Sequence, residues 1–224
     1  MTVTVALDRV EVAFGRTLAL HDVTLELAPG VTGLFGPNGS GKSTLLSVLA
    51  GLLRPTAGAA TCAGAPVGAS REEWRRLVGY AGHDPGLYPA LTVGENLDLW
   101  AKLFDAPSRR VDVVIEQLGL GDRRHTAVRS LSAGYSRRAA VARALLHEPV
   151  VLLLDEPYAN LDDEAAALVS AAVVGWRRPD RIGVIATHGA KKVKAYADAG
   201  IILRRGRVIS YRRGAQQLAQ AAAT

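Results

Sequence analysis

The segment Gly36-Pro-Asn-Gly-Ser-Gly-Lys-Ser43 limits the possible folds of this chain most strongly, because it matches the pattern G-x-x-x-x-G-K-[S/T]. Glycines in such a loop let successive backbone N–H groups curl around a phosphate, since no Cβ hinders positive φ angles. The loop follows the apolar run Val31–Phe35 and precedes a helical pattern over Lys42–Leu53. This order predicts a phosphate-binding turn between a strand and a helix, and a plain glycine-rich turn is the alternative.

Each residue type in the loop has an expected chemical role. Lys42 is expected to reach the β and γ phosphates of a nucleotide, and the Ser43 hydroxyl to ligate Mg²⁺, which prefers oxygen. The helix that follows adds free N–H groups and the positive end of its dipole. The predicted nucleotide-binding residues of this segment are Gly36, Pro37, Asn38, Gly39, Ser40, Gly41, Lys42, Ser43 and Thr44.

Two acidic residues follow a second apolar run. Val150–Leu154 is apolar throughout, as expected for a parallel strand covered on both faces, and Asp155 and Glu156 come next. Ligands of parallel sheets bind beyond the carboxyl ends of the strands, where neighbouring side chains point in opposite directions. We therefore expect Asp155 to hold the metal through a water molecule, and Glu156 to act as general base on the attacking water. The alternative is a turn or helix start that favours acids.

The order of the predicted elements indicates the fold class. Alternating strands and helices predict an α/β fold with a mostly parallel core sheet and helices on both faces. We expect one domain over residues 1–224, with an antiparallel β addition at the start and a helical subdomain inserted at about residues 84–147. The predicted strands are Thr2–Ala13, Asp22–Leu27, Val31–Phe35, Ala59–Cys62, Leu77–Ala81, Val150–Leu154, Arg181–Ala186 and Gly200–Leu203; the predicted helices are Lys42–Leu53, Ser70–Arg76, Thr92–Phe104, Val111–Leu118, Ser132–His147, Asp162–Trp176 and Ala190–Ala197.

Composition narrows the functional classes. The single cysteine, Cys62, excludes an internal disulfide and a metal site built from cysteines. The net charge is +6, but the arginine pairs are scattered and form no continuous stripe, which disfavours nucleic-acid binding. The N-terminus does not have the pattern of a signal peptide, and the apolar stretches Thr44–Leu53 and Ala165–Trp176 are too short to cross a bilayer. We expect a soluble chain whose membrane role, if it has one, requires a partner.

The segment Leu131-Ser-Ala-Gly-Tyr135 distinguishes among the classes of phosphate-loop proteins. It opens a predicted helix and resembles the L-S-G-G-Q signature of ATP-binding cassette (ABC) ATPases. A serine hydroxyl and glycine N–H groups at a helix N-terminus suit an anion, although a plain serine-capped helix is the alternative. Three other sites also resemble this family: Phe14 the aromatic residue that stacks on adenine, residues 159–162 the D-loop, and His188 the switch histidine. The alternatives are a core aromatic for Phe14 and a solvated loop residue for His188.

The resemblance implies a P-loop NTPase of the ABC ATPase type that binds ATP and Mg²⁺. Its expected catalytic residues are Lys42, Glu156 and His188, and Phe14 joins the phosphate loop in binding the nucleotide. Ser132 and Gly134 are expected to bind the nucleotide of a partner subunit, in a homodimer or a paired cassette. The resemblance further implies that the chain lies at the cytoplasmic face of the membrane and drives a membrane-spanning transporter subunit.

Two departures from the family pattern refine this expectation. His83 stands where the family usually has a glutamine that contacts Mg²⁺ and the membrane subunit, so we expect a water-mediated metal contact, with an ordinary surface histidine as the alternative. Coupling to the membrane subunit is expected around His83–Tyr88. Gly82-His-Asp-Pro-Gly86 resembles the G-H-x-P-G loop of the ATP-binding subunit of the cytochrome c maturation haem exporter. Ala133 and Tyr135 replace the signature Gly and Gln, so the family role of Tyr135 is not carried over.

Two other functions compete with a transporter ATPase. One is a non-transport ABC ATPase that works on nucleic acid or ribosomes, which RNA or DNA would stimulate. The other is a GTPase or small-molecule kinase acting alone, against which the signature segment argues.

Overall fold

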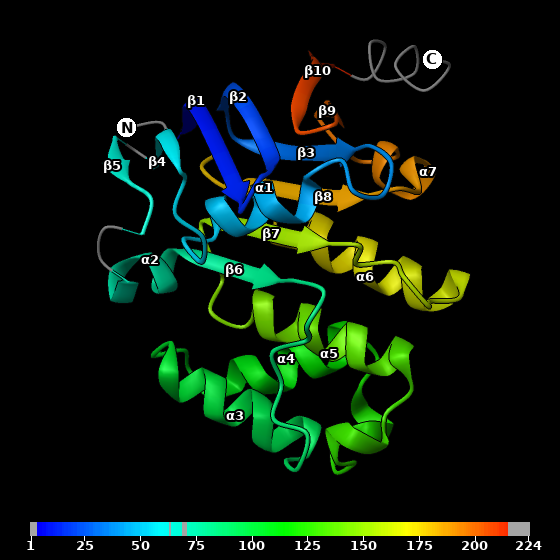
Figure 1. Ribbon diagram of the computed structural model, residues 1–224. Coiled ribbons are helices and arrows are strands. Elements are labelled where there is room, and N and C mark those ends of the chain that lie inside the picture. The colour runs from blue at the N-terminus through cyan, green and yellow to red at the C-terminus, as the bar shows by residue number, and fades with distance from the viewer. Residues whose placement is uncertain (1–3, 63, 69–70, 215–224) are drawn as a thin grey trace.

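A six-stranded sheet forms the centre of the computed structural model, which describes residues 4–62, 64–68 and 71–214 (Figure 1). Its strand order is β10-β9-β3-β8-β7-β6. Neighbouring strands are parallel except for β9 and β10, which form an antiparallel edge. The strands are β3 (Gly30–Phe35), β6 (Val78–Ala81), β7 (Val151–Asp155), β8 (Ile182–Thr187), β9 (Ala199–Arg204) and β10 (Arg207–Arg213).

Strand β7 shows why its sequence is apolar without interruption. All five of its residues are buried. Val151 and Leu153 belong to one hydrophobic cluster, whereas Leu152 and Leu154 belong to the other. Because successive side chains point to opposite faces, a strand covered on both sides needs apolar residues at every position.

A second, antiparallel sheet covers one face of the central sheet. Its strand order is β2-β1-β4-β5, with β1 (Val5–Phe14), β2 (Thr17–Leu27), β4 (Ala57–Cys62) and β5 (Ala65–Pro66). Helix α1 (Lys42–Leu49) contributes Leu45 and Leu46 to the hydrophobic cluster that contains Val10 and Leu20 of this sheet. The phosphate-loop helix is therefore held by both sheets.

Helices cover the other face and extend beyond β6 (Figure 1). Helices α3 (Val93–Leu103), α4 (Arg109–Gln117) and α5 (Ala133–Leu145) lie between β6 and β7 in the sequence, with short 3₁₀ turns at Gly121–Arg123 and Val128–Ser130. The remaining helices are α2 (Arg71–Leu77), α6 (Asp163–Trp176) and α7 (Ala190–Lys194). No helix in the described part of the chain has the length and apolarity that crossing a membrane requires. The assignment of residues 84–147 as an inserted subdomain stays a prediction.

Side chains fix where helices α3, α5 and α6 begin. Thr92 and Glu95 form a capping box at the start of α3, since the Thr92 hydroxyl accepts from the Glu95 N–H and the Glu95 carboxylate accepts from the Thr92 N–H. Ser132 caps α5, and the carboxylate of Asp162 caps α6 by accepting from the Ala165 N–H at 2.7 Å.

Several predicted boundaries are wrong. Helix α1 ends at Leu49 rather than Leu53, because Gly51 turns the chain with φ 70° and the Leu52 and Leu53 N–H groups return to the Ser47 carbonyl. Strand β10 was not predicted, β2 begins at Thr17 rather than Asp22, and α7 ends at Lys194 rather than Ala197. The first two residues of the predicted strand Thr2–Ala13, and Ser70 of the predicted helix Ser70–Arg76, lie outside the described residues.

Candidate active site

The phosphate loop connects β3 to α1 and has the backbone that its glycines permit. Gly36, Gly39 and Gly41 have φ angles of 155°, 74° and 102°. A Cβ on Gly36 would lie 2.1 Å from the Leu203 carbonyl oxygen, and a Cβ on Gly41 would lie 2.6 Å from the carbonyl oxygen of Ala19. Both positions therefore need glycine because a side chain would not fit and because φ is positive. A Cβ on Gly39 would have no neighbour within 4 Å, so glycine is needed there for its φ angle alone.

Two polar groups in the loop fit a phosphate. The Lys42 ammonium donates to the carbonyl oxygens of Gly36 at 2.8 Å and Pro37 at 3.1 Å, so the side chain folds back across the loop. Lys42 is 7% exposed and Ser40 is 2% exposed. The Ser40 hydroxyl has no hydrogen-bond partner among the described residues. A buried cation and an unpartnered buried hydroxyl suit an anion with several acceptor oxygens.

A cavity of about 370 Å³ joins the loop to residues distant in sequence. The lining residues are Ala19, Asn38, Gly39, Ser40, Gly41, Lys42, Ser43, Thr44, His83, Asp155 and Glu156. The structure therefore places His83 and both acids beside the phosphate loop. Gly36 does not line this cavity, and Pro37 lines a neighbouring one together with Arg204 and Arg205.

Asp155 has the surroundings of a cation ligand. It ends β7 and is 4% exposed. Among the described residues no ion pair involves its carboxylate. A buried carboxylate without a cationic partner is costly unless a cation binds there. With the Ser43 hydroxyl in the same cavity, the oxygen donors fit Mg²⁺, whereas the nitrogen of His83 fits it less well.

Glu156 turns away from Asp155 towards the end of β8. Its φ of 47° lies in the left-handed region, which is strained for a residue with a side chain. One carboxylate oxygen, Oε2, accepts from the Thr187 hydroxyl at 3.0 Å, and the other, Oε1, accepts from the His188 N–H at 2.8 Å. The His188 ring nitrogen Nδ1 also lies 3.0 Å from Oε1. Because an ionised carboxylate only accepts, this contact suits Nδ1 of the His188 ring as the donor.

Sequence reasoning did not find the part that Thr187 has in this arrangement. Its hydroxyl holds Glu156 and also accepts from the Gly189 N–H at 3.0 Å. The available signal was its position at the end of β8, next to the predicted His188. Ala19, which also lines the cavity, has no signal in the sequence.

The three predicted nucleotide contacts that are not in the phosphate loop also lie outside the cavity. Phe14 ends β1 and is 55% exposed. The Ser132 hydroxyl caps α5 by accepting from the Tyr135 N–H at 3.4 Å. A Cβ on Gly134 would lie 2.8 Å from the Asn160 carbonyl oxygen, so the start of α5 packs against the predicted D-loop. Within one subunit, Ser132 and Gly134 therefore do not line the same cavity as Lys42.

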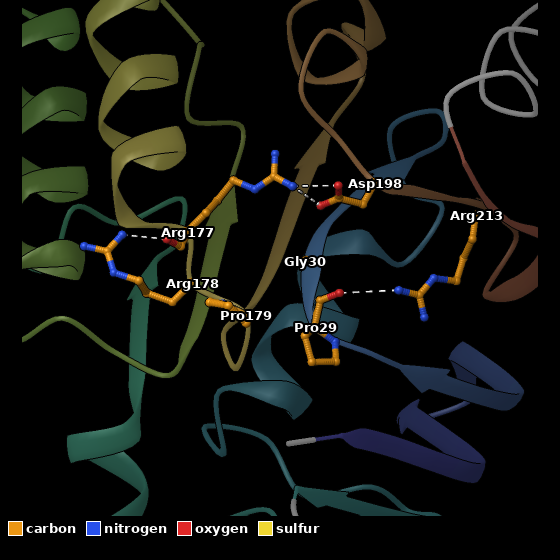
Figure 2. A pocket seen from close by; sticks show the side chains of 7 residues that line it. All are labelled: Pro29, Gly30, Arg177, Arg178, Pro179, Asp198 and Arg213. Carbon is orange, nitrogen blue, oxygen red and sulfur yellow. Dashed lines mark hydrogen bonds and ion pairs between the residues drawn. The ribbon is translucent and has the colours of Figure 1, made fainter. Parts of the chain in front are cut away.

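A second cavity, of about 430 Å³, lies at the opposite end of the central sheet (Figure 2). One guanidinium nitrogen of Arg177, Nη2, donates to both carboxylate oxygens of Asp198, at 2.6 and 2.7 Å. Arg178 extends away from Asp198 and donates to backbone carbonyls, and Arg213 donates to the carbonyl of Pro29 (Figure 2). The arginine side chains do not converge on one point, so this cavity does not resemble an anion site.

Residues 20–159 match the protein family described as ABC transporter. The match covers more than half of the chain and includes the phosphate loop, His83, the signature segment and both acids. The chain belongs to the ABC transporter family. The prediction that the chain is related to ABC ATP-binding proteins is confirmed.

Curated relatives of this ABC protein include both importers and exporters. A methionine import ATP-binding protein, MetN 2 of Burkholderia mallei, is 36% identical over 207 residues, which cover 87% of this chain and 52% of that protein. The cytochrome c biogenesis ATP-binding export protein CcmA of Cupriavidus pinatubonensis is 40% identical over 163 residues, which cover 72% of each. The chain spans about half the length of the first of these relatives.

Solved structures confirm the predicted fold class. The ATP-binding subunit of an ABC transporter superposes with a TM-score of 0.87 and 26% identity, covering 97% of this chain and 93% of that one. The ATP-binding cassette MJ0796, in a dimeric post-hydrolysis state, superposes with a TM-score of 0.84 and 24% identity, covering 93% of this chain and 98% of that one. The α/β fold of ABC ATPases is thus shared over almost the whole ABC chain.

Proposed function

We propose that the chain binds and hydrolyses ATP and drives a separate membrane-spanning transporter subunit at the cytoplasmic face of the membrane. The observation that carries the proposal is the single cavity shared by the phosphate loop, Asp155 and Glu156. In this proposal the residues of the cavity would supply a triphosphate cradle, a cation ligand and a base side by side, as phosphoryl transfer to water requires.

In this proposal each residue of the cavity has a separate role in hydrolysis. Lys42 and the loop N–H groups hold and orient the triphosphate, Ser43 would be a ligand for Mg²⁺, and Asp155 and His83 would reach the ion through water. Bound Mg²⁺ supplies positive charge against the phosphate oxygens. Glu156 accepts the proton of the attacking water. Its two oxygens offer about four acceptor sites, three of which Thr187 and His188 occupy, so one remains for water.

The proposed working unit is a head-to-tail pair of cassettes. Ser132 and Gly134 lie outside the cavity of their own subunit, and in the pair they would close over the nucleotide of the partner. Phe14 would stack on the adenine, and His188 would contact the γ-phosphate. Because ATP gains these contacts only in the closed pair, its binding shifts the pair towards closure, and hydrolysis allows opening.

For the cargo, we propose haem export in cytochrome c maturation. The 40% identity to CcmA and the loop Gly82–Gly86 support it, whereas the methionine importer shares 36% identity. We infer that this chain would contact the membrane subunit around His83–Tyr88, and the exposed side chain of Tyr88 supports this inference.

Replacement of Glu156 by glutamine tests the proposed ATPase. The substitution keeps the shape but removes the proton acceptor, so turnover should fall by about 100-fold or more while Mg-ATP binding persists. Size-exclusion chromatography with ATP should then show a trapped dimer. Glu116→Gln on α4, an exposed position, serves as the matched control. Unchanged hydrolysis in Glu156→Gln would remove Glu156 as the base.

Reconstitution with a membrane subunit tests the transport role. Co-purification of the chain from its native membrane should yield a membrane-spanning protein that stimulates the ATPase in vesicles. Stimulation by haem rather than by methionine would support the proposed cargo. Stimulation by RNA or DNA, with no response to the membrane subunit, would favour the non-transport alternative instead.

A further inference from the structure

Arg137 connects helix α5 to both strands that end at the active site. Its guanidinium nitrogen Nη1 donates to the Gly82 carbonyl at 2.7 Å and, at a longer distance of 3.4 Å, faces the carbonyl of Asp155. Gly82 directly precedes His83, and Asp155 directly precedes Glu156. One side chain therefore touches the backbone beside three groups of the proposed active site.

The two carbonyls lie where the ladder between β6 and β7 ends. The last paired residues of these parallel strands are Ala81 and Leu154. Gly82 and Asp155 are the next residues along each strand, and Arg137 bridges them from the side of α5. One charged nitrogen, Nη1, thus contacts both acceptors, and hydrogen bonds from a charged donor are stronger than those between neutral groups.

The other arginines of α5 hold different parts of the protein. Arg138 donates to the carbonyls of Leu118 and Gly119 at 2.7 and 2.9 Å, which fixes α5 to the turn after α4. Arg143 donates to the Tyr80 carbonyl at 2.7 Å and lies over the ring of Trp100. Of these three arginines, Arg137 is nearest in sequence to Ser132 and alone contacts both β6 and β7 ends.

We propose that Arg137 is a positioning residue that couples the Ser132 end of α5 to His83, Asp155 and Glu156. When the start of α5 closes over the nucleotide of the partner subunit, a shift of the helix reaches the metal and base groups of its own subunit through this guanidinium. The two nucleotide sites of a pair are thereby linked. The inference rests on the proposed function, because the start of α5 contacts nucleotide only in a closed pair.

Three variants of the full chain test this coupling: Arg137→Ala, Arg137→Lys and the control Arg109→Ala, an exposed position on α4. The expected result for Arg137→Ala is a kcat about tenfold below wild type, with the Kd for Mg-ATP within about twofold. Lysine keeps the charge and can reach one carbonyl, so Arg137→Lys should recover kcat to within about threefold of wild type. Arg109→Ala should match wild type.

A second measurement separates positioning from a general loss of structure. In the Glu156→Gln background, Arg137→Ala should need about tenfold more ATP for half-maximal dimer formation, as followed by size-exclusion chromatography. Wild-type kcat in Arg137→Ala, or an unchanged ATP requirement for dimer formation, would overturn the inference. If the alanine variant does not fold, Arg137→Met, which keeps much of the side-chain length but has no hydrogen-bond donor, takes its place: reduced kcat with unchanged ATP affinity supports coupling, and wild-type kcat overturns it. Absence of hydrolysis in the wild-type chain would instead refute the proposed function.

Discussion

The two ends of the central sheet differ in whether their polar side chains have partners within the chain. At the carboxyl end, Asp155 is buried without an ion pair among the described residues, the Ser40 hydroxyl has no partner there, and Glu156 has a strained backbone. At the amino end, Asp198 accepts from Arg177 and also from the Val31 N–H at 2.7 Å. A buried carboxylate without an ion pair and a buried hydroxyl without a partner suit a bound ligand, so the contrast between Asp155 and Asp198 favours ligand binding at the carboxyl end.

The amino end also shows that positive charge alone does not make a site. Arg177, Arg178 and Arg213 line the cavity, yet each donates to a carboxylate or a carbonyl of the same chain (Figure 2). At the carboxyl end, Lys42 also donates to carbonyls, but these belong to the loop that would hold the phosphate. Substitutions at the two ends should therefore separate activity from stability.

The largest expected effect is on activity, from Lys42→Ala at the carboxyl end. Loss of the ammonium removes the only predicted side-chain cation for the β and γ phosphates, so hydrolysis should fall by about 100- to 1,000-fold. Thermal unfolding should change little, because the lost hydrogen bonds join residues within one loop. The measurements are phosphate release and calorimetric titration with Mg-ATP. Lys102→Ala on α3, an exposed position, is the control, and equal turnover in the two variants would contradict the site.

The next effect is on stability in acid and comes from His147, just before β7. Burial lowers the pKa of His147 to about 4, and its ring stacks on Phe104 at 4.1 Å. The unfolded chain binds a proton at about pH 6.5, whereas the folded chain does not until about pH 4. The contribution of neutral His147 to the free energy of unfolding is therefore complete above about pH 6.5. It is lost as the pH falls towards 4, and the loss amounts to at most about 3 kcal/mol.

His147→Phe tests this dependence. The variant keeps an aromatic ring against Phe104 but cannot titrate, so its unfolding free energy should decrease less between pH 7 and pH 5 than that of wild type. Urea unfolding at the two pH values measures the difference. Parallel losses in both proteins would show that His147 is not the titrating group.

The sequence predicted that the phosphate loop and the two acids follow strands, because the signals for these positions are local. The phosphate loop is contiguous, and Asp155 and Glu156 directly follow an apolar run that suits a doubly covered strand. The sequence could not predict the Glu156–Thr187 hydrogen bond, because this bond depends on the pairing of β7 with β8. The same holds for the contact of Arg137 with Gly82, across 55 positions of sequence.

Strand β10 was missed although a local signal was present. Arg205 and Gly206, with φ angles of 49° and 75°, form a two-residue turn between the antiparallel strands β9 and β10. A residue followed by glycine is a frequent hairpin turn, because both positions need positive φ. The strand itself carries charged residues at its exposed edge, so its hydrophobic alternation is weak.

At the amino end, Asp198→Asn should lower stability and leave hydrolysis unchanged. The substitution removes the charge that Arg177 pairs with but keeps an oxygen that can accept from the Val31 N–H. Since both partners are more than a third exposed, we expect a loss of about 1 kcal/mol in urea unfolding. Asp180→Asn, an exposed position three residues after Arg177 in the sequence, is the control. A fall in kcat at constant stability would contradict the division between the two ends.

The smallest effect is expected from Arg213→Ala. Its contact with the Pro29 carbonyl is long, at 3.4 Å, and its side chain is exposed, so the net contribution to stability should stay below about 0.5 kcal/mol. Hydrolysis should also equal that of wild type, because the cavity lies at the opposite end of the sheet from Lys42. Urea unfolding and phosphate release measure both. A loss of ATPase activity would show that this cavity communicates with the nucleotide site, and the separation of the two ends would then fail.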